Sequence, residues 1–172
     1  VSRLLHAIGD FERIGDHAIN IQDSARELQE KELRFSPTAE KELQVLGTAL
    51  EDILFQAVSS FNQDDPAAAK AVEPLEETID QLTEEIRMRH IQRLQTGECT
   101  IQLGFVLNDL LTNLERVSDH CSNIAVCVIE ERDSSVDHHA YLHRLKVDDN
   151  FAEELREDPV SYTHLRAHET SQ

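Results

Sequence analysis

Two pairs of carboxylates are the side chains of this sequence whose type and spacing suit metal chemistry. Glu12 and Asp16 form one pair, and Glu115 and Asp119 form the other. Residues four apart share one face of an α-helix, so each pair presents its two carboxylates side by side. Such like charges, when exposed, destabilise a helix by about 0.3 kcal/mol. A bound hard cation such as Mg²⁺, Mn²⁺ or iron would turn this repulsion into coordination.

Each pair belongs to one copy of an internal repeat. The segment Glu12–Ile21 reads ERIGDHAINI and the segment Glu115–Ile124 reads ERVSDHCSNI, and six of the ten positions are identical. A repeat on two helices suggests two pseudo-equivalent units. Each copy also places a histidine directly after its second acid, so His17 and His120 could contribute nitrogen ligands at the rim of a metal site.

A further acidic segment could face the second pair. Glu76 and Asp80 are again four residues apart and precede the second copy in the chain. If the helix that carries them packs beside the helix of Glu115 and Asp119, all four carboxylates converge on one groove.

Solvated helix faces are the alternative interpretation of these acids. The sequence holds 34 Asp and Glu residues among 172, and that composition alone gives about seven acid pairs at the helical spacing. The two histidines are equally compatible with partly buried polar neighbours, and Arg13 and Arg116 with ion pairs to nearby carboxylates. Spacing therefore leaves metal binding open.

Long helices must position these residues. Apolar residues recur every three or four positions through four segments, and Ser36-Pro37 and Asp65-Pro66 form helix-start signals. Pro74 predicts a kink in the third segment or a later start near Glu73. We expect an all-α fold, an up-and-down antiparallel bundle of four long helices. The segments are residues 1–31, 36–61, 66–95 and 100–132.

Composition narrows the class of protein further. The formal net charge is −18, which repels nucleic-acid phosphates and anionic lipid headgroups, so we expect no nucleic-acid partner. Three cysteines without framework spacing suit a reducing compartment. The purely apolar run Ile124–Ile129 is far below the roughly 20 residues of a membrane helix.

The two decapeptides resemble the signature of the PhoU family, in which a Glu-Arg-[Ile/Val]-x-Asp-His run occurs once per three-helix repeat. On this resemblance, residues 1–31 are the last helix of a first repeat whose other helices are missing. Residues 36–133 are a complete second repeat. The run 105–131 is similar to the PhoU-like domain that follows the membrane part of bacterial sodium/phosphate cotransporters.

The resemblance implies a regulatory domain in phosphate transport, not an enzyme. The implied partner is the transmembrane phosphate transporter portion of the same or another chain, at the cytoplasmic face of the cell membrane, with a homodimer as a further expectation. Family motifs of this kind are linked to multinuclear iron or zinc sites. Carried over, the ligands are Glu12 and Asp16 in one site, and Glu115, Asp119, Glu76 and Asp80 in the other.

The two rival functions are an enzyme and a metal-free scaffold. A di-iron enzyme of the four-helix class needs Glu-x-x-His pairs, which the expected helices lack. A metal-free helical scaffold that docks a transporter or signalling partner is the stronger alternative.

The bundle is expected to span residues 1–146. Residues 147–172 are expected to be an acidic tail followed by a non-native extension, because the last residues are rich in Ser, Thr and His and nearly free of acids.

Overall fold

The computed structural model describes residues 2–132 of the chain. The expected end of the bundle at residue 146 and the tail 147–172 lie outside the described residues. Within 2–132 no helix is long and apolar enough to cross a membrane. The elements are α1 (Ser2–Glu30), α2 (Pro37–Gln63), α3 (Pro66–Ala69), α4 (Val72–Gln95) and α5 (Ile101–Arg132).

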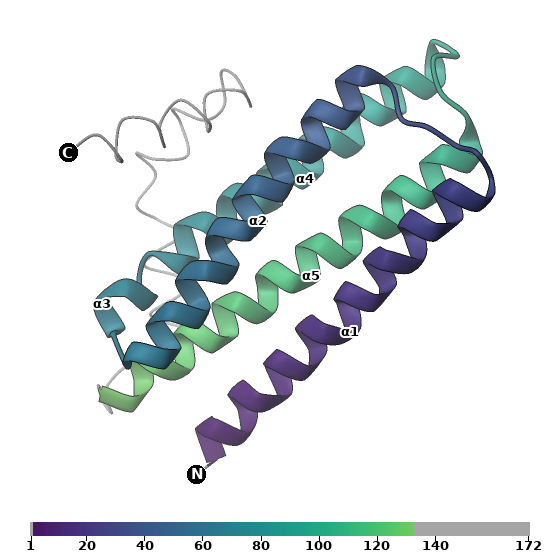
Figure 1. The fold of residues 1–172 in the computed structure, drawn as a ribbon. Coiled ribbons are helices and arrows are strands. Elements are labelled where there is room, and N and C mark those ends of the chain that lie inside the picture. The colour runs from purple at the N-terminus through teal and green to yellow at the C-terminus, as the bar shows by residue number, and fades with distance from the viewer. Residues whose placement is uncertain (1, 133–172) are drawn as a thin grey trace.

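Helices α2, α4 and α5 form the core of the protein, and each runs opposite to the one before it (Figure 1). Their apolar stripes meet in one cluster that includes fully buried Leu46 of α2, Ile79 of α4 and Leu111 of α5. Each such side chain stabilises the fold by about 2 kcal/mol through its removal from water. The all-α up-and-down bundle expected from the sequence is confirmed.

Helix α1 lies along α5 and is less well covered (Figure 1). Ile14 and Ile21 pack against the core cluster, and the ring of Phe11 meets that of Phe61 edge-on at 5.3 Å. Other apolar side chains of α1 remain more than half exposed: Leu4, Leu5, Ile8 and Ile19. The apolar stripe of α1 is therefore only partly buried within the described residues.

The helix starts follow their sequence signals. The Ser36 hydroxyl accepts a hydrogen bond from the Ala39 amide at 3.3 Å, and Pro37 opens α2. The Asp65 carboxylate accepts hydrogen bonds from the amides of Ala67 and Ala68. These side chains satisfy amide groups that a helix start leaves without an intrahelical partner.

The third expected helix is divided in two. A continuous helix from Pro66 to Gln95 was wrong, because α3 ends at Ala69 and α4 begins at Val72. The alternative of a later start near Glu73 is confirmed to within one residue. Pro74 thus lies in the first turn of α4, where a missing amide hydrogen removes no helical hydrogen bond, and no kink is needed to accommodate it.

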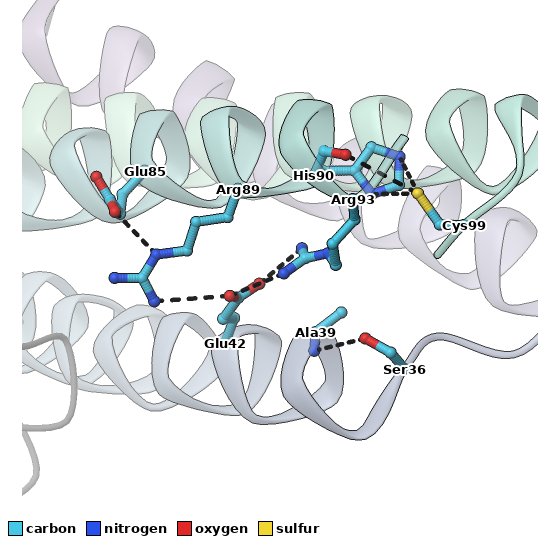
Figure 2. Close-up of polar contacts among 8 residues, drawn as sticks. All are labelled: Ser36, Ala39, Glu42, Glu85, Arg89, His90, Arg93 and Cys99. Carbon is cyan, nitrogen blue, oxygen red and sulfur yellow. Dashed lines mark hydrogen bonds and ion pairs between the residues drawn. The ribbon is translucent and has the colours of Figure 1, made fainter. Parts of the chain in front are cut away.

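A buried ion pair joins α2 to α4, and Figure 2 shows it. The Arg93 guanidinium donates to both carboxylate oxygens of Glu42 at 3.0 and 2.8 Å, and both residues are more than nine-tenths buried. Arg89 lies between two carboxylates: its Nε is 2.8 Å from Oε1 of the exposed Glu85, and its Nη1 is 3.6 Å from Oε1 of Glu42. Breaking a buried pair of this kind leaves a charge without its counter-ion, which is strongly destabilising.

His90 lies beside this pair, near the turn that joins α4 to α5 (Figure 2). Burial, assisted by the positive charge of Arg93, lowers the pKa of His90, and Glu42 opposes the shift. The shift favours the neutral form of the imidazole. Gly104 of α5 provides its space, since a Cβ there would lie 3.0 Å from His90 Nε2.

Candidate metal centre between α4 and α5

A row of polar side chains follows the line along which α4 and α5 meet. Nearer the connecting turn, Arg87 Nη2 donates to Glu115 Oε2 at 2.7 Å. At the far end, the Ser122 hydroxyl donates to Glu73 Oε2 at 2.7 Å. Because the helices are antiparallel, the residues between these two contacts face one another in order. We call this row the acidic seam: Glu73, Glu76, Asp80, Arg87, Glu115, Asp119 and Ser122.

Three carboxylates converge in the middle of the acidic seam. One oxygen each of Glu76, Asp80 and Asp119 lies within 4.8 Å of the others. Glu76 and Asp80 share a face of α4 through their four-residue spacing, and Asp119 reaches them from α5. Glu76 is only 8% exposed, and the other two are partly buried. We refer to these three residues as the carboxylate cluster.

Glu115 lies next to the cluster but is held by a cation of the protein itself. The spacing of the four acids predicted that Glu115 would converge with the other three, and the structure pairs it with Arg87 instead. Arg87 Nη1 also lies 3.7 Å from Glu84 Oε2. Arg116 pairs with Asp119 at 3.1 Å on the exposed side, as expected for a nearby carboxylate.

The residues present fit a hard cation. Carboxylate oxygens around such an ion sit about 2.0–2.6 Å from it, so oxygens on opposite sides are about 4–5 Å apart. The hydroxyls of Thr83 and Ser118 are completely buried and make no hydrogen bond within the part of the chain that the structure describes. Thr83 follows Asp80 by three residues on α4, and Ser118 directly precedes Asp119 on α5.

The first copy of the repeat has a different environment. Glu12 and Asp16 are exposed on α1, and neither joins a group of three metal-ligating side chains in residues 2–132. Helix α1 packs chiefly on α5 and presents these acids away from that contact. The first predicted metal site therefore has two carboxylates and no facing acidic helix among the described residues.

The two predicted rim histidines lie in the interface between α1 and α5. His17 Nδ1 is 2.8 Å from Asn113 Oδ1, and His120 Nδ1 is 2.9 Å from Asp10 Oδ1. Their rings stack with centroids 5.6 Å apart. Each ring nitrogen that faces an oxygen donates a proton to it, which fixes the orientation of the imidazole.

The same interface has pseudo-two-fold symmetry. The two repeat copies are offset by 103 residues, so Asn20 corresponds to Asn123, and the same offset just before the copies pairs Asp10 with Asn113. Asn20 donates to Asn113 at 3.1 Å, and Asn123 donates to Asp10 at 3.3 Å. The two halves of the interface thus repeat one hydrogen-bond pattern with a single difference, an aspartate in place of an asparagine.

Sequence reasoning missed Asp10, Asn113 and Arg87. The first two are acid and amide at matching positions just before the two decapeptides, so extending the repeat comparison by two residues would have found them. Arg87 offers a weaker signal, because its partner Glu115 is 28 residues away.

Comparisons with known proteins agree on one family. The family model described as PhoU domain matches residues 43–128. The chain is 29% identical over 126 residues to the phosphate-specific transport system accessory protein PhoU homolog 1 of Thermotoga maritima, covering 73% of this chain and 53% of that protein. It is 24% identical over 127 residues to the phosphate-specific transport system accessory protein PhoU homolog of Deinococcus radiodurans, covering 73% of this chain and 57% of that protein.

A second Deinococcus radiodurans protein, described as uncharacterized, is 26% identical over 123 residues, covering 71% of this chain and 44% of that protein. The chain thus spans about half the length of the curated relatives it matches. No solved structure matches.

Proposed function

Because the chain belongs to the PhoU family, we propose that it is a regulatory domain of phosphate transport that acts on a transporter and performs no catalysis. Two relatives are described as accessory proteins of a phosphate-specific transport system. The observation that carries the proposal is the family match over the segment that contains both walls of the acidic seam. The match starts in α2 and ends in α5, so it includes every member of the carboxylate cluster.

The carboxylate cluster would hold an iron or zinc ion as the structural element of this regulation. Glu76 and Asp80 would bind from α4 and Asp119 from α5, with Glu115 within reach of the same ion. When bound, such an ion neutralises like charges and connects two helices. The protein's own side chains then fix the angle between α4 and α5, and any partner that docks on these helices would sense that angle.

The partner is a membrane transporter of phosphate. On the resemblance of residues 105–131 noted in the sequence, we propose that the chain is a cytoplasmic tail of a sodium/phosphate cotransporter, at the inner face of the cell membrane. In such a tail the transporter portion belongs to the same chain. A separate transporter chain is the other arrangement, and the accessory-protein relatives favour it.

A metal-free docking scaffold is the second candidate function. The exposed apolar side chains Leu4, Leu5, Ile8 and Ile19 of α1 favour it, because exposed apolar groups of this size are typical of surfaces that another protein element covers. In that case the exposed acids of the helix faces serve solubility and partner choice.

The metal content of the purified chain separates these candidates. We would prepare it anaerobically, expose it to iron or zinc, and measure bound metal by elemental mass spectrometry. The test variant Asp80→Asn/Asp119→Asn removes two cluster carboxylates. The matched control Glu12→Gln/Asp16→Asn removes two carboxylates of the same repeat motif from exposed positions on α1. Metal retained by the parent and the control but lost by the test variant supports the cluster.

Equal, negligible metal in all three proteins would favour the scaffold. The transport role itself is tested by uptake of radiolabelled phosphate in cells whose copy of the gene is deleted and then restored. We expect uptake at high external phosphate to change on deletion and to return to normal on restoration. Uptake that is indifferent to the gene would contradict a role in phosphate transport.

A further inference from the structure

Arg87 occupies the position in the acidic seam where it can compete with a bound cation. Its Nη2 lies 2.7 Å from Glu115 Oε2, and both side chains are about one-third exposed. Glu115 precedes Asp119, a member of the carboxylate cluster, by four residues, so the two side chains share one face of α5, one helical turn apart. A glutamate side chain can reach either neighbour through rotation about its side-chain bonds.

If the Glu115 side chain moved from Arg87 to a bound cation, Arg87 would still have a second acidic partner. Arg87 Nη1 is already 3.7 Å from Glu84 Oε2, on the same helix. Glu84 is mostly exposed, with 67% of its side chain accessible. The guanidinium can therefore move toward Glu84 and water when Glu115 leaves, and no buried charge remains without a counter-ion.

We propose that Arg87 is an internal competitor for the cluster's cation: it holds Glu115 in the metal-free protein and releases it as a fourth carboxylate ligand when a cation binds. This inference rests on the metal role in the proposed function. It explains why three of the four expected acids converge in the structure while the fourth pairs with an arginine. Arg87 then lowers cation affinity and makes binding reversible at working concentrations.

The first half of the test measures Mn²⁺ affinity by isothermal titration calorimetry of the whole chain. Arg87→Gln removes the charge and keeps much of the length of the side chain, and we expect it to tighten Mn²⁺ binding by about three- to tenfold. Arg87→Lys keeps the charge and should stay near the parent. Arg89→Gln is the matched control, because Arg89 pairs with Glu85 and Glu42 instead of the seam. Any general effect of losing one positive charge appears in both glutamine variants.

The second half of the test is a double-mutant cycle with Glu115→Gln. If Glu115 joins the cation only after leaving Arg87, then Arg87→Gln gains nothing once Glu115 is neutral. The side-chain Nε–Hε resonance of Arg87 gives a readout independent of affinity. It should shift on addition of Mg²⁺, a diamagnetic substitute for Mn²⁺, in the parent and remain unchanged in Glu115→Gln. Circular dichroism establishes that each variant is folded.

The outcomes distinguish this inference from the proposed function. Tighter binding in Arg87→Gln alone, abolished by Glu115→Gln, supports the competition. Intact cation binding with equal affinities for parent, Arg87→Gln and Arg89→Gln overturns the competition and leaves the metal role standing. Absence of Mg²⁺, Mn²⁺, iron and zinc binding in the parent overturns the metal role, and the competition with it.

Discussion

The two copies of the repeated decapeptide lie on adjacent helices of the same protein, yet their carboxylates have unlike surroundings. Asp119 on α5 meets Glu76 and Asp80 of α4 within 4.8 Å. Its counterpart Asp16 on α1 is exposed. The helices that carry them pack against each other through matching hydrogen bonds, so the difference does not come from the copies themselves. It comes from what faces each copy on its other side.

A motif therefore supplies only half of a carboxylate cluster that could hold a metal ion. Four-residue spacing places two carboxylates on one helix face, and a second acidic helix must come from elsewhere in the fold. Helix α4 supplies it for the second copy. The region made of α2, α4 and α5 is a packed core, whereas α1 is attached along one side of α5. The predictions below contrast matched positions in these two regions.

The largest contrast is expected between a buried and an exposed ion pair. Arg93→Ala leaves the Glu42 carboxylate buried with only the 3.6 Å contact to Arg89, and should lower the free energy of unfolding by about 3–5 kcal/mol. Arg26→Ala on α1 removes an ion pair to Asp23 in which both side chains are more than half exposed. It should change the free energy of unfolding by about 0.5 kcal/mol or less. Urea unfolding followed by circular dichroism measures both. Similar losses would mean that α1 is as tightly structured as the core.

A second contrast uses apolar residues at matching repeat positions. Leu111 of α5 is fully buried, and its counterpart Ile8 of α1 is 53% exposed. Leu111→Ala should destabilise the fold by about 3 kcal/mol, through lost burial and the cavity left behind. Ile8→Ala should have an effect within about 0.5 kcal/mol. A large loss for Ile8→Ala in the isolated chain would show that another surface covers α1 in solution, as in a dimer, and the sedimentation coefficient would then reveal it.

The third contrast concerns the single asymmetry of the α1–α5 interface. His120→Ala removes the donor nearest to Asp10, a carboxylate only 14% exposed, and should cost about 2 kcal/mol. His17→Ala removes the equivalent donor to the neutral amide of Asn113 and should cost about 1 kcal/mol. Thermal unfolding at constant pH compares the two. In the Asp10→Asn background, His120→Ala and His17→Ala should cost the same stability. A difference that persists there would come from the histidines themselves.

Much of the fold was predictable from the sequence because its signals are local. The three- and four-residue recurrence of apolar side chains defined the long helices, and Ser36 and Asp65 marked two starts through bonds to amides only two or three residues away. The division at Ala69 was harder to predict. Pro74 is compatible with either a kink or a first-turn position, and only the packing of the alanine-rich α3 on its neighbours decides between them.

The carboxylate cluster was predictable in outline and incomplete in detail. Spacing gave the two pairs, and the expected contact of α4 with α5 brought three of the four acids together. The position of the fourth acid, Glu115, is set by its ion pair with Arg87. Sequence alone does not show that Glu115 contacts an arginine 28 residues away in preference to the neighbouring carboxylates. The buried pair of Glu42 and Arg93 was missed for a similar reason. Both occupy inward positions of their helices, and only the register between α2 and α4 shows that the charges meet.

The smallest contrast tests the carboxylate cluster without any metal. Arg116 pairs with Asp119 on its exposed side, but one oxygen of Asp119 also lies within 4.8 Å of carboxylate oxygens of Glu76 and Asp80. Carboxylates this close disfavour one another's ionised form, so Asp119→Asn should raise the free energy of unfolding in the presence of EDTA by about 0.5–1 kcal/mol. The counterpart variant Asp16→Asn removes a carboxylate from an exposed position. It should change the free energy of unfolding by no more than about 0.3 kcal/mol.

Addition of Mn²⁺ should reverse the order. A ligand that binds only the folded state stabilises the parent by about 2.7 kcal/mol at a hundredfold excess over its dissociation constant. Asp119→Asn should lose most of that gain, and Asp16→Asn should keep it. Unfolding in urea with EDTA and with Mn²⁺ gives both quantities on the same samples. If the two variants respond alike in EDTA and in Mn²⁺, then the facing acids of α4 confer nothing on the second copy. The difference between the copies would then be one of burial alone.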